Sequence, residues 1–188
     1  MNLANKLTIS RMILAVIFIL SLFIRGVGAK FFALAVFLTA CVTDYYDGLI
    51  ARKKEIITEF GKLMDPIADK ILILGAFLAF VEMKIIPSWM VMVIIARELV
   101  ITGIRIIALS RKKVLSASMA GKHKTVSQMV AVLSVLIFLI IRDSGFTFQY
   151  IEYYSSGVYM LMLITVLMTL TSGVSFMLKN KYIFMGEE

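Results

Sequence analysis

Four aspartates in a short stretch of an otherwise apolar chain are the residues whose types and spacing could do chemistry. They are Asp44, Asp47, Asp65 and Asp69. Residues three or four apart on a helix share a face, so Asp44 and Asp47 would form one pair, and Asp65 and Asp69 a second pair on another helix. Carboxylate oxygens are ligands of hard cations, and Mg²⁺ is usually held by a few carboxylates, waters and phosphates. The spacing predicts a site for two metal ions, Mg²⁺ or else Mn²⁺.

Small and basic residues accompany the first aspartate pair. Gly48 and Ala51 lie on the helix face beside the aspartates, where a short side chain lets a ligand approach the backbone closely. Arg52 follows Gly48 by one turn, and its planar guanidinium can bind a phosphate through two hydrogen bonds. Close packing between membrane helices also favours small residues, and it is the alternative explanation for Gly48 and Ala51. Because four aspartates lie nearby in the sequence, we favour ligand binding over helix packing as the reason for Gly48 and Ala51.

The composition predicts an integral membrane protein. Of the 188 residues, 61% are hydrophobic, and the mean hydropathy is +0.95. A membrane-spanning helix needs about 20 mostly apolar residues. We therefore expect an all-α single domain over residues 1–188 with six transmembrane helices, preceded by a short interfacial amphipathic helix over residues 5–11. The predicted spans cover residues 12–25, 31–52, 66–82, 86–109, 125–141 and 157–178.

The third span has a specific predicted start. Asp65 directly precedes Pro66, a pattern typical of a helix that begins with an N-cap aspartate and has proline at its first position. The aspartates would then lie at the ends of the second and third spans.

Cys41 is the only cysteine, and its apolar surroundings predict a packed thiol. His123, the only histidine, is predicted to be a solvated loop residue between lysines.

Basic residues predict the orientation of the chain. With six spans and a cytoplasmic N-terminus, thirteen Lys and Arg residues fall in cytoplasmic segments, whereas four fall in outer loops: Arg25, Lys30, Lys84 and Arg142. The positive-inside rule then places both termini and the aspartates at the cytoplasmic side of the cell membrane. Topology and anionic lipid headgroups together explain much of the net charge of +8, so we expect membrane lipid and no nucleic acid as a partner.

The aspartate motif resembles a known family. The pattern Asp44-x2-Asp47-Gly48-x2-Ala51-Arg52-x8-Gly61-x3-Asp65-x3-Asp69 is similar at every defined position to the signature of the CDP-alcohol phosphotransferases. The resemblance implies six transmembrane helices and a homodimer. It also implies transfer of a phosphatidyl-type group from a CDP-linked donor, here CDP-diacylglycerol, to an alcohol, with release of CMP.

The same resemblance implies roles for single residues. Asp44, Asp47 and Asp65 would bind the metal ions, whereas Asp69 would contact the second ion and act as the catalytic base. The donor-binding residues would be Thr8, Gly48, Ala51, Arg52, Thr58 and Gly61. In-line attack of an alcohol on a pyrophosphate agrees with these roles, because two cations can stabilise the charge that develops at both ends of the reaction.

Three basic residues predict the acceptor. A phosphate-bearing acceptor needs cations beside the metal site, and Arg105, Lys122 and Lys124 could supply them. Charge alone also allows inositol phosphate. The segments Ala96-Arg97-Glu98-Leu99 and Gly121 to Gln128 resemble family members that use sn-glycerol 3-phosphate, which is therefore the predicted acceptor. Arg97 and Glu98 are adjacent and would not face each other, so each is either paired with a neighbouring span or part of the site.

Several other functions remain open from the sequence alone. Serine or phosphatidylglycerol could replace glycerol 3-phosphate as the acceptor. A divalent-cation transporter would also carry carboxylates in membrane helices, although it would need them near the middle of the bilayer. A scaffold subunit would have no need for the complete motif, and membrane prenyltransferases use aspartate motifs with a different spacing. An assay of CMP release distinguishes these classes.

Overall fold

A computed structural model of the chain describes residues 3–54, 59–110, 119–145 and 148–180, and describes side chains within 9–43, 70–108, 121–145 except 122, and 153–180. The described residues form helices and connecting turns, with no strand among them. The six helices are α1 (Leu3–Phe23), α2 (Val27–Lys54), α3 (Glu59–Glu82), α4 (Ser88–Ser110), α5 (Met119–Asp143) and α6 (Phe148–Lys179). This confirms the predicted all-α architecture.

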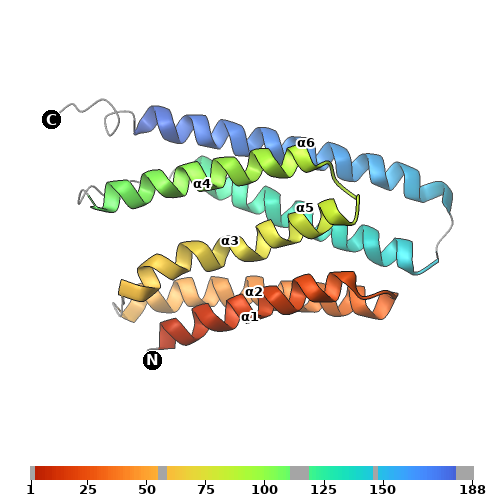
Figure 1. Cartoon of the computed structure of the whole chain (residues 1–188), viewed down its shortest axis with the longest axis horizontal. Helices are drawn as coiled ribbons and strands as arrows, with labels where there is room; N and C mark the ends of the chain where they lie inside the picture. The colour runs from red at the N-terminus through yellow and green to blue at the C-terminus, as the bar shows by residue number, and fades with distance from the viewer. Residues whose placement is uncertain (1–2, 55–58, 111–118, 146–147, 181–188) are drawn as a thin grey trace.

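The helices run alternately up and down a bundle. Figure 1 shows the first residues of α1 and the last residues of α6 at the same end, together with the junction between α2 and α3. Helix α1 packs on α2 and α3, α5 packs on α2, α3 and α6, and α4 packs on α3 and α6. The aspartate-bearing ends of α2 and α3 therefore lie at the end of the bundle that holds both ends of the described chain.

One apolar core connects all six helices, because its buried side chains come from each of them. Its large buried side chains include Phe18 of α1, Phe37 of α2, Phe77 of α3 and Leu136 of α5. The rings of Phe18 and Phe37 are 5.3 Å apart between centroids, within the range of favourable aromatic contacts. Cys41 packs against this core, as predicted for a structural thiol. In this core α1 and α5 each pack against both α2 and α3.

The turns at the opposite end of the bundle follow simple backbone chemistry. Gly26 and Gly145 adopt positive φ values of 104° and 79° after α1 and α5, a conformation that glycine reaches without a steric cost. The last carbonyls of α1 are bound by the buried ammonium of Lys30, whose Nζ donates to Leu22 O at 2.5 Å and to Ile24 O at 2.8 Å. A cation at this position satisfies carbonyls that have no partner within the helix.

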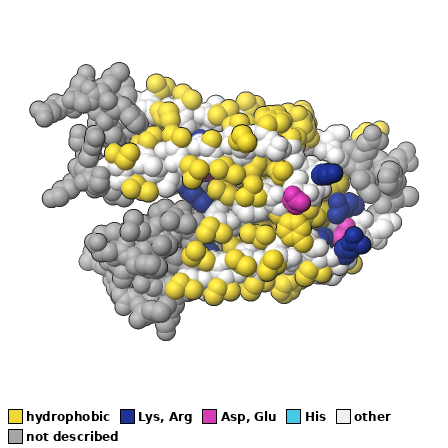
Figure 2. Space-filling model, viewed as in Figure 1, with side chains coloured by type: hydrophobic (Ala, Val, Ile, Leu, Met, Phe, Trp, Pro, Cys, Tyr) yellow, Lys and Arg dark blue, Asp and Glu magenta, His cyan; other side chains and the backbone are white. Residues whose placement is uncertain are grey.

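The outer surface is apolar. Hydrophobic side chains cover much of the described face in Figure 2, and charged side chains gather at the end away from the α2–α3 junction. Two segments of the described part, His123–Asp143 and Tyr153–Lys179, are long and apolar enough to cross a membrane by length and composition; Ile9–Phe23 and Val27–Thr43 are shorter apolar helices. These features fit an integral membrane protein.

Three local predictions differ from the structure. Residues 3–23 form one unbroken helix, so a separate interfacial helix over residues 5–11 is not distinguished. Helix α3 begins at Glu59, which puts Pro66 inside the helix and makes the predicted start at Asp65 wrong. A proline within a helix removes one backbone hydrogen bond, and membrane helices tolerate this loss. His123 is exposed as predicted, but it lies on α5 and not in a loop.

Candidate active site

The predicted metal ligands occupy the ends of two consecutive helices. Asp44 and Asp47 belong to α2, and Asp65 and Asp69 belong to α3. Only residues 55–58 separate the two helices, and a chain spans at most about 3.6 Å per residue. The end of α2 and the start of α3 are therefore at most about 18 Å apart, so both helices reach the same region of the bundle. The side chains of the four aspartates lie outside those that the structure describes.

The predicted donor-binding residues lie near the same helix ends in the chain. Helix α2 carries Gly48, Ala51 and Arg52, and α3 carries Gly61. Thr8 lies in α1. Their side-chain contacts are not described, and Thr58 lies outside the described residues. Their roles remain predictions.

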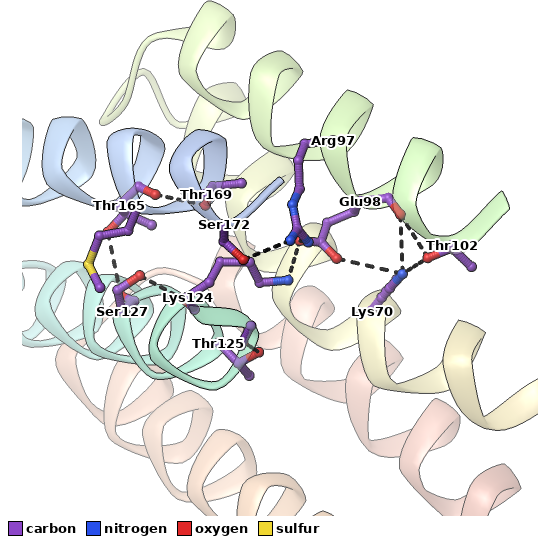
Figure 3. Close-up of polar contacts among 12 residues, drawn as sticks. Lys70, Arg97, Glu98, Thr102, Lys124, Thr125, Ser127, Thr165, Thr169 and Ser172 are labelled. Atoms are coloured by element: carbon purple, nitrogen blue, oxygen red, sulfur yellow. Dashed lines mark hydrogen bonds and ion pairs between the residues drawn. The ribbon is translucent and has the colours of Figure 1, made fainter. Parts of the chain in front are cut away.

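A buried polar cluster surrounds Glu98 near the middle of α4 (Figure 3). Its carboxylate accepts a hydrogen bond from the Nζ of Lys124 on α5, and its Oε2 lies 3.6 Å from the Nζ of Lys70 on α3. The Lys70 ammonium also donates to Thr102 Oγ1 and to the backbone oxygen of Glu98, the latter at 3.3 Å. The carboxylate of Glu98 on α4 therefore pairs with cations from both α3 and α5.

Arg97 extends this cluster to the last helix. Its Nη1 lies 3.1 Å from Glu98 Oε1, and its Nη2 donates to Ser172 Oγ of α6 at 2.9 Å. Pairing with neighbouring spans is thereby confirmed for both Arg97 and Glu98. The expectation that the two side chains do not face each other was wrong, because long side chains can bend toward a common partner even when their Cβ atoms diverge.

The three predicted acceptor-binding residues have different surroundings. Arg105 of α4 is exposed, and its guanidinium carbon lies 5.4 Å from the centroid of the Phe176 ring, a cation–π geometry. Lys124 is buried and bound to Glu98. Lys122 lies in α5, and its side chain is outside the described set. A role in acceptor binding remains a prediction for all three.

A small cavity lined by both charged and apolar residues lies within the bundle. It has a volume of about 40 Å³, and its lining includes Arg11, Lys70, Glu98, Lys124 and Gln128. The Nε2 of Gln128 is buried without a hydrogen-bond partner among the described residues. This volume has room for water molecules but not for a nucleotide. Among the described residues, the cavity belongs to the interior of the polar cluster.

The sequence analysis missed the roles of Lys70, Thr102 and Ser172. Lys70 directly follows Asp69 and lies within an apolar segment, and a lysine in that setting needs a partner. That signal could have identified it. Thr102 and Ser172 carry no comparable signal, because single hydroxyls are common in membrane helices and usually bond to their own helix.

Comparison with known proteins settles the family. The family model described as CDP-alcohol phosphatidyltransferase matches residues 1–171. The chain belongs to the CDP-alcohol phosphatidyltransferase family. The predicted resemblance is confirmed over nearly the whole chain, including α5 and most of α6, which carry no signature residue. Proteins of the CDP-alcohol phosphatidyltransferase family are membrane proteins and generally depend on a divalent metal.

Individual relatives carry more specific names. A Bacillus subtilis (strain 168) protein named CDP-diacylglycerol–glycerol-3-phosphate 3-phosphatidyltransferase is 39% identical over 148 residues, which cover 72% of this chain and 77% of the relative. A Rickettsia bellii protein of the same name is 36% identical over 136 residues, covering 72% and 75%. A probable phosphatidylglycerophosphate synthase of Mycobacterium tuberculosis is 44% identical over 134 residues, covering 70% of this chain and 64% of the relative. These members of the CDP-alcohol phosphatidyltransferase family share one named activity.

Proposed function

We propose that this protein transfers the phosphatidyl group of CDP-diacylglycerol to sn-glycerol 3-phosphate, giving phosphatidylglycerophosphate and CMP. The observation that carries the proposal is the match of about 70% of the chain to several relatives named for this reaction, at 36–44% identity. The complete aspartate signature supports the chemistry, and the adjacent ends of α2 and α3 support a shared site.

The four aspartates suit two Mg²⁺ ions. Oxygen ligands from two neighbouring helix ends match the preference of this cation, which retains waters and binds substrate phosphates. Asp44, Asp47 and Asp65 would hold the ions, and Asp69 would contact one of them. When bound, the ions supply charge stabilisation for a phosphoryl transfer. Mn²⁺ is the alternative metal.

Residues of the chain would carry out the proton transfer and bind the donor. Asp69 accepts the proton of the glycerol 3-phosphate hydroxyl, and the oxygen of that hydroxyl bonds to the phosphatidyl phosphorus. The bond from that phosphorus to the bridging oxygen of the pyrophosphate breaks, and CMP leaves with the electron pair. A positioned general base typically contributes about 10²–10⁴-fold to such a step. Arg52 binds the pyrophosphate, while Thr8, Gly48, Ala51, Thr58 and Gly61 receive the cytidine part of the donor.

Arg105, Lys122 and Lys124 form the proposed site for the acceptor phosphate. Arg105 is favoured by its exposure and by Phe176, whose ring supports the guanidinium from one side. Lys124 is already bound to Glu98, so it would contribute its charge at short range from a fixed position. A phosphate dianion would complement the positive charge of these three residues.

In the proposed assembly the protein is a single domain that spans the cell membrane six times, with both termini and the active site facing the cytoplasm, and forms a homodimer. The common end of α1 and α6 in Figure 1 supports an even number of spans. The thirteen-to-four division of basic residues supports the orientation. Access of a membrane-impermeant reagent to a C-terminal tag measures it, and a tag reached only from outside would contradict it.

One assay tests the function. Purified protein with Mg²⁺ and CDP-diacylglycerol is offered glycerol 3-phosphate, serine, inositol phosphate or phosphatidylglycerol separately, and CMP release is measured. The fastest release is expected with glycerol 3-phosphate. Faster release with another acceptor would refute the acceptor but retain the chemistry, whereas no release with any acceptor would refute the enzymatic function.

A further inference from the structure

A continuous chain of polar contacts joins the last helix to the helix that carries Asp69. Ser172 of α6 accepts from Arg97 Nη2 at 2.9 Å, Arg97 Nη1 lies 3.1 Å from Glu98 Oε1, and Glu98 Oε2 lies 3.6 Å from Lys70 Nζ. Figure 3 shows these groups in sequence across α6, α4 and α3. Lys70 is the residue directly after Asp69 in α3.

Burial restricts the Arg97, Glu98 and Lys124 part of this network, whereas Lys70, whose side chain is 23% exposed, is held by its bonds to Thr102 Oγ1 and to Glu98 O. The side chains of Glu98, Lys124 and Arg97 are only 6%, 9% and 11% exposed. In such a setting, charged groups are held by their partners because water does not compete for them. Lys124 supplies a second fixed cation to the same carboxylate, so Glu98 is held from α5 as well as from α4.

The surface of α6 is shaped to receive Arg97. A Cβ atom on Gly173 would lie 3.1 Å from Arg97 Cγ and 3.3 Å from its Nε. Glycine at this position therefore lets the arginine stem lie against the helix backbone while its guanidinium reaches Ser172. Ser172 and Gly173 of α6, a helix without signature residues, therefore both accommodate the side chain of Arg97.

We propose that Arg97 and Glu98 are positioning residues for the reaction: through Lys70 they fix the turn of α3 that carries Asp69, and Ser172 and Gly173 of α6 anchor them. This inference rests on the proposed function. It gives the last helix a role in the geometry of the metal site. Displacement of a reacting group by about 1 Å can cost on the order of 100-fold in rate, so anchoring this turn matters for turnover even where folding is preserved.

A pair of neighbouring hydroxyls on α6 provides the matched test. Ser172→Ala removes the acceptor of Arg97, whereas Thr171→Ala removes an exposed hydroxyl that bonds to Leu167 O of its own helix at 2.9 Å. Each is combined with Glu98→Gln in a double-mutant cycle. The measurements on folded, purified full-length protein are kcat, the KM for CDP-diacylglycerol, and the Mg²⁺ concentration that gives half-maximal thermal protection.

Ser172→Ala is expected to lower kcat by about 3- to 10-fold, the factor that one net hydrogen bond represents, with the donor KM within about twofold of wild type. Glu98→Gln should lower kcat further and raise the Mg²⁺ midpoint by about fivefold or more. Residues in one network couple, so Ser172→Ala should add less than about twofold to Glu98→Gln. Thr171→Ala should change each quantity by less than about twofold, because its bond is local.

Two outcomes would overturn the positioning role. One is an unchanged kcat and Mg²⁺ midpoint in both Ser172→Ala and Glu98→Gln, with only the yield of folded protein reduced, which is the result of a purely structural ion pair. The other is full additivity of the two substitutions. If the wild type releases no CMP with any acceptor, the proposed function fails, and the coupling measured in the Mg²⁺ midpoint decides the positioning role by itself.

Discussion

Replacement of Glu98 by alanine is the most informative perturbation of the polar cluster. The wild-type carboxylate is the anion shared by Lys70, Arg97 and Lys124. Glu98→Ala would remove it and leave three cations near one another inside the bundle. Each then lacks a counter-charge and repels the other two, so the folded state loses more than one ion pair.

The expected loss follows from the burial of these groups. Breaking a buried ion pair by removing one partner typically costs about 3–5 kcal/mol. The side chain of Lys70 is 23% exposed, compared with 9% for Lys124 and 11% for Arg97, so Lys70 can turn toward water and reduce the cost. We expect about 3 kcal/mol, which corresponds to a fall in Tm of about 6–12 °C for a protein of this size.

Thermal unfolding of the purified protein in detergent measures this shift. The matched control is Asp143→Ala, which breaks the Arg142–Asp143 pair at 3.2 Å, where the arginine side chain is 37% exposed. A surface pair contributes at most about 1 kcal/mol, so the control should lower Tm by less than about 4 °C. Equal shifts in the two variants would refute the conclusion that the Glu98 cluster is a buried, mutually dependent network.

Three further outcomes are expected. Asp69→Asn should abolish turnover while CDP-diacylglycerol binding, measured by equilibrium dialysis, stays detectable; near-normal turnover would eliminate Asp69 as the base. Arg105→Ala should raise the KM for glycerol 3-phosphate about tenfold or more, the scale of one charge-assisted contact, with a smaller effect on the donor KM; equal effects on both substrates would contradict an acceptor site. Lys30→Met should destabilise the protein by about 1.5–3 kcal/mol, because Leu22 and Ile24 carbonyls lose their donor, whereas exposed Lys84→Met should leave Tm nearly unchanged.

Much of the fold follows from local sequence signals. The predicted span over residues 86–109 lies within two residues of α4 at each end, because Pro87 precedes the apolar run. The span predicted over residues 157–178 begins nine residues after the start of α6. A hydropathy window registers only apolar length, whereas a helix continues through polar residues such as Gln149 and Glu152 as long as its backbone bonds persist.

The sequence by itself determined the family, the aspartate signature and the six helical segments, because these depend on residue types at fixed spacing along one chain. The tertiary structure alone decided which helices pack together, and therefore which partners Glu98 acquires from α3 and α5. It also brought Ser172 to Arg97 across 75 positions of sequence. A charged residue in an apolar segment indicates that it needs a partner, but several spans carry residues of the opposite charge. Only the packing of side chains between helices selects among them.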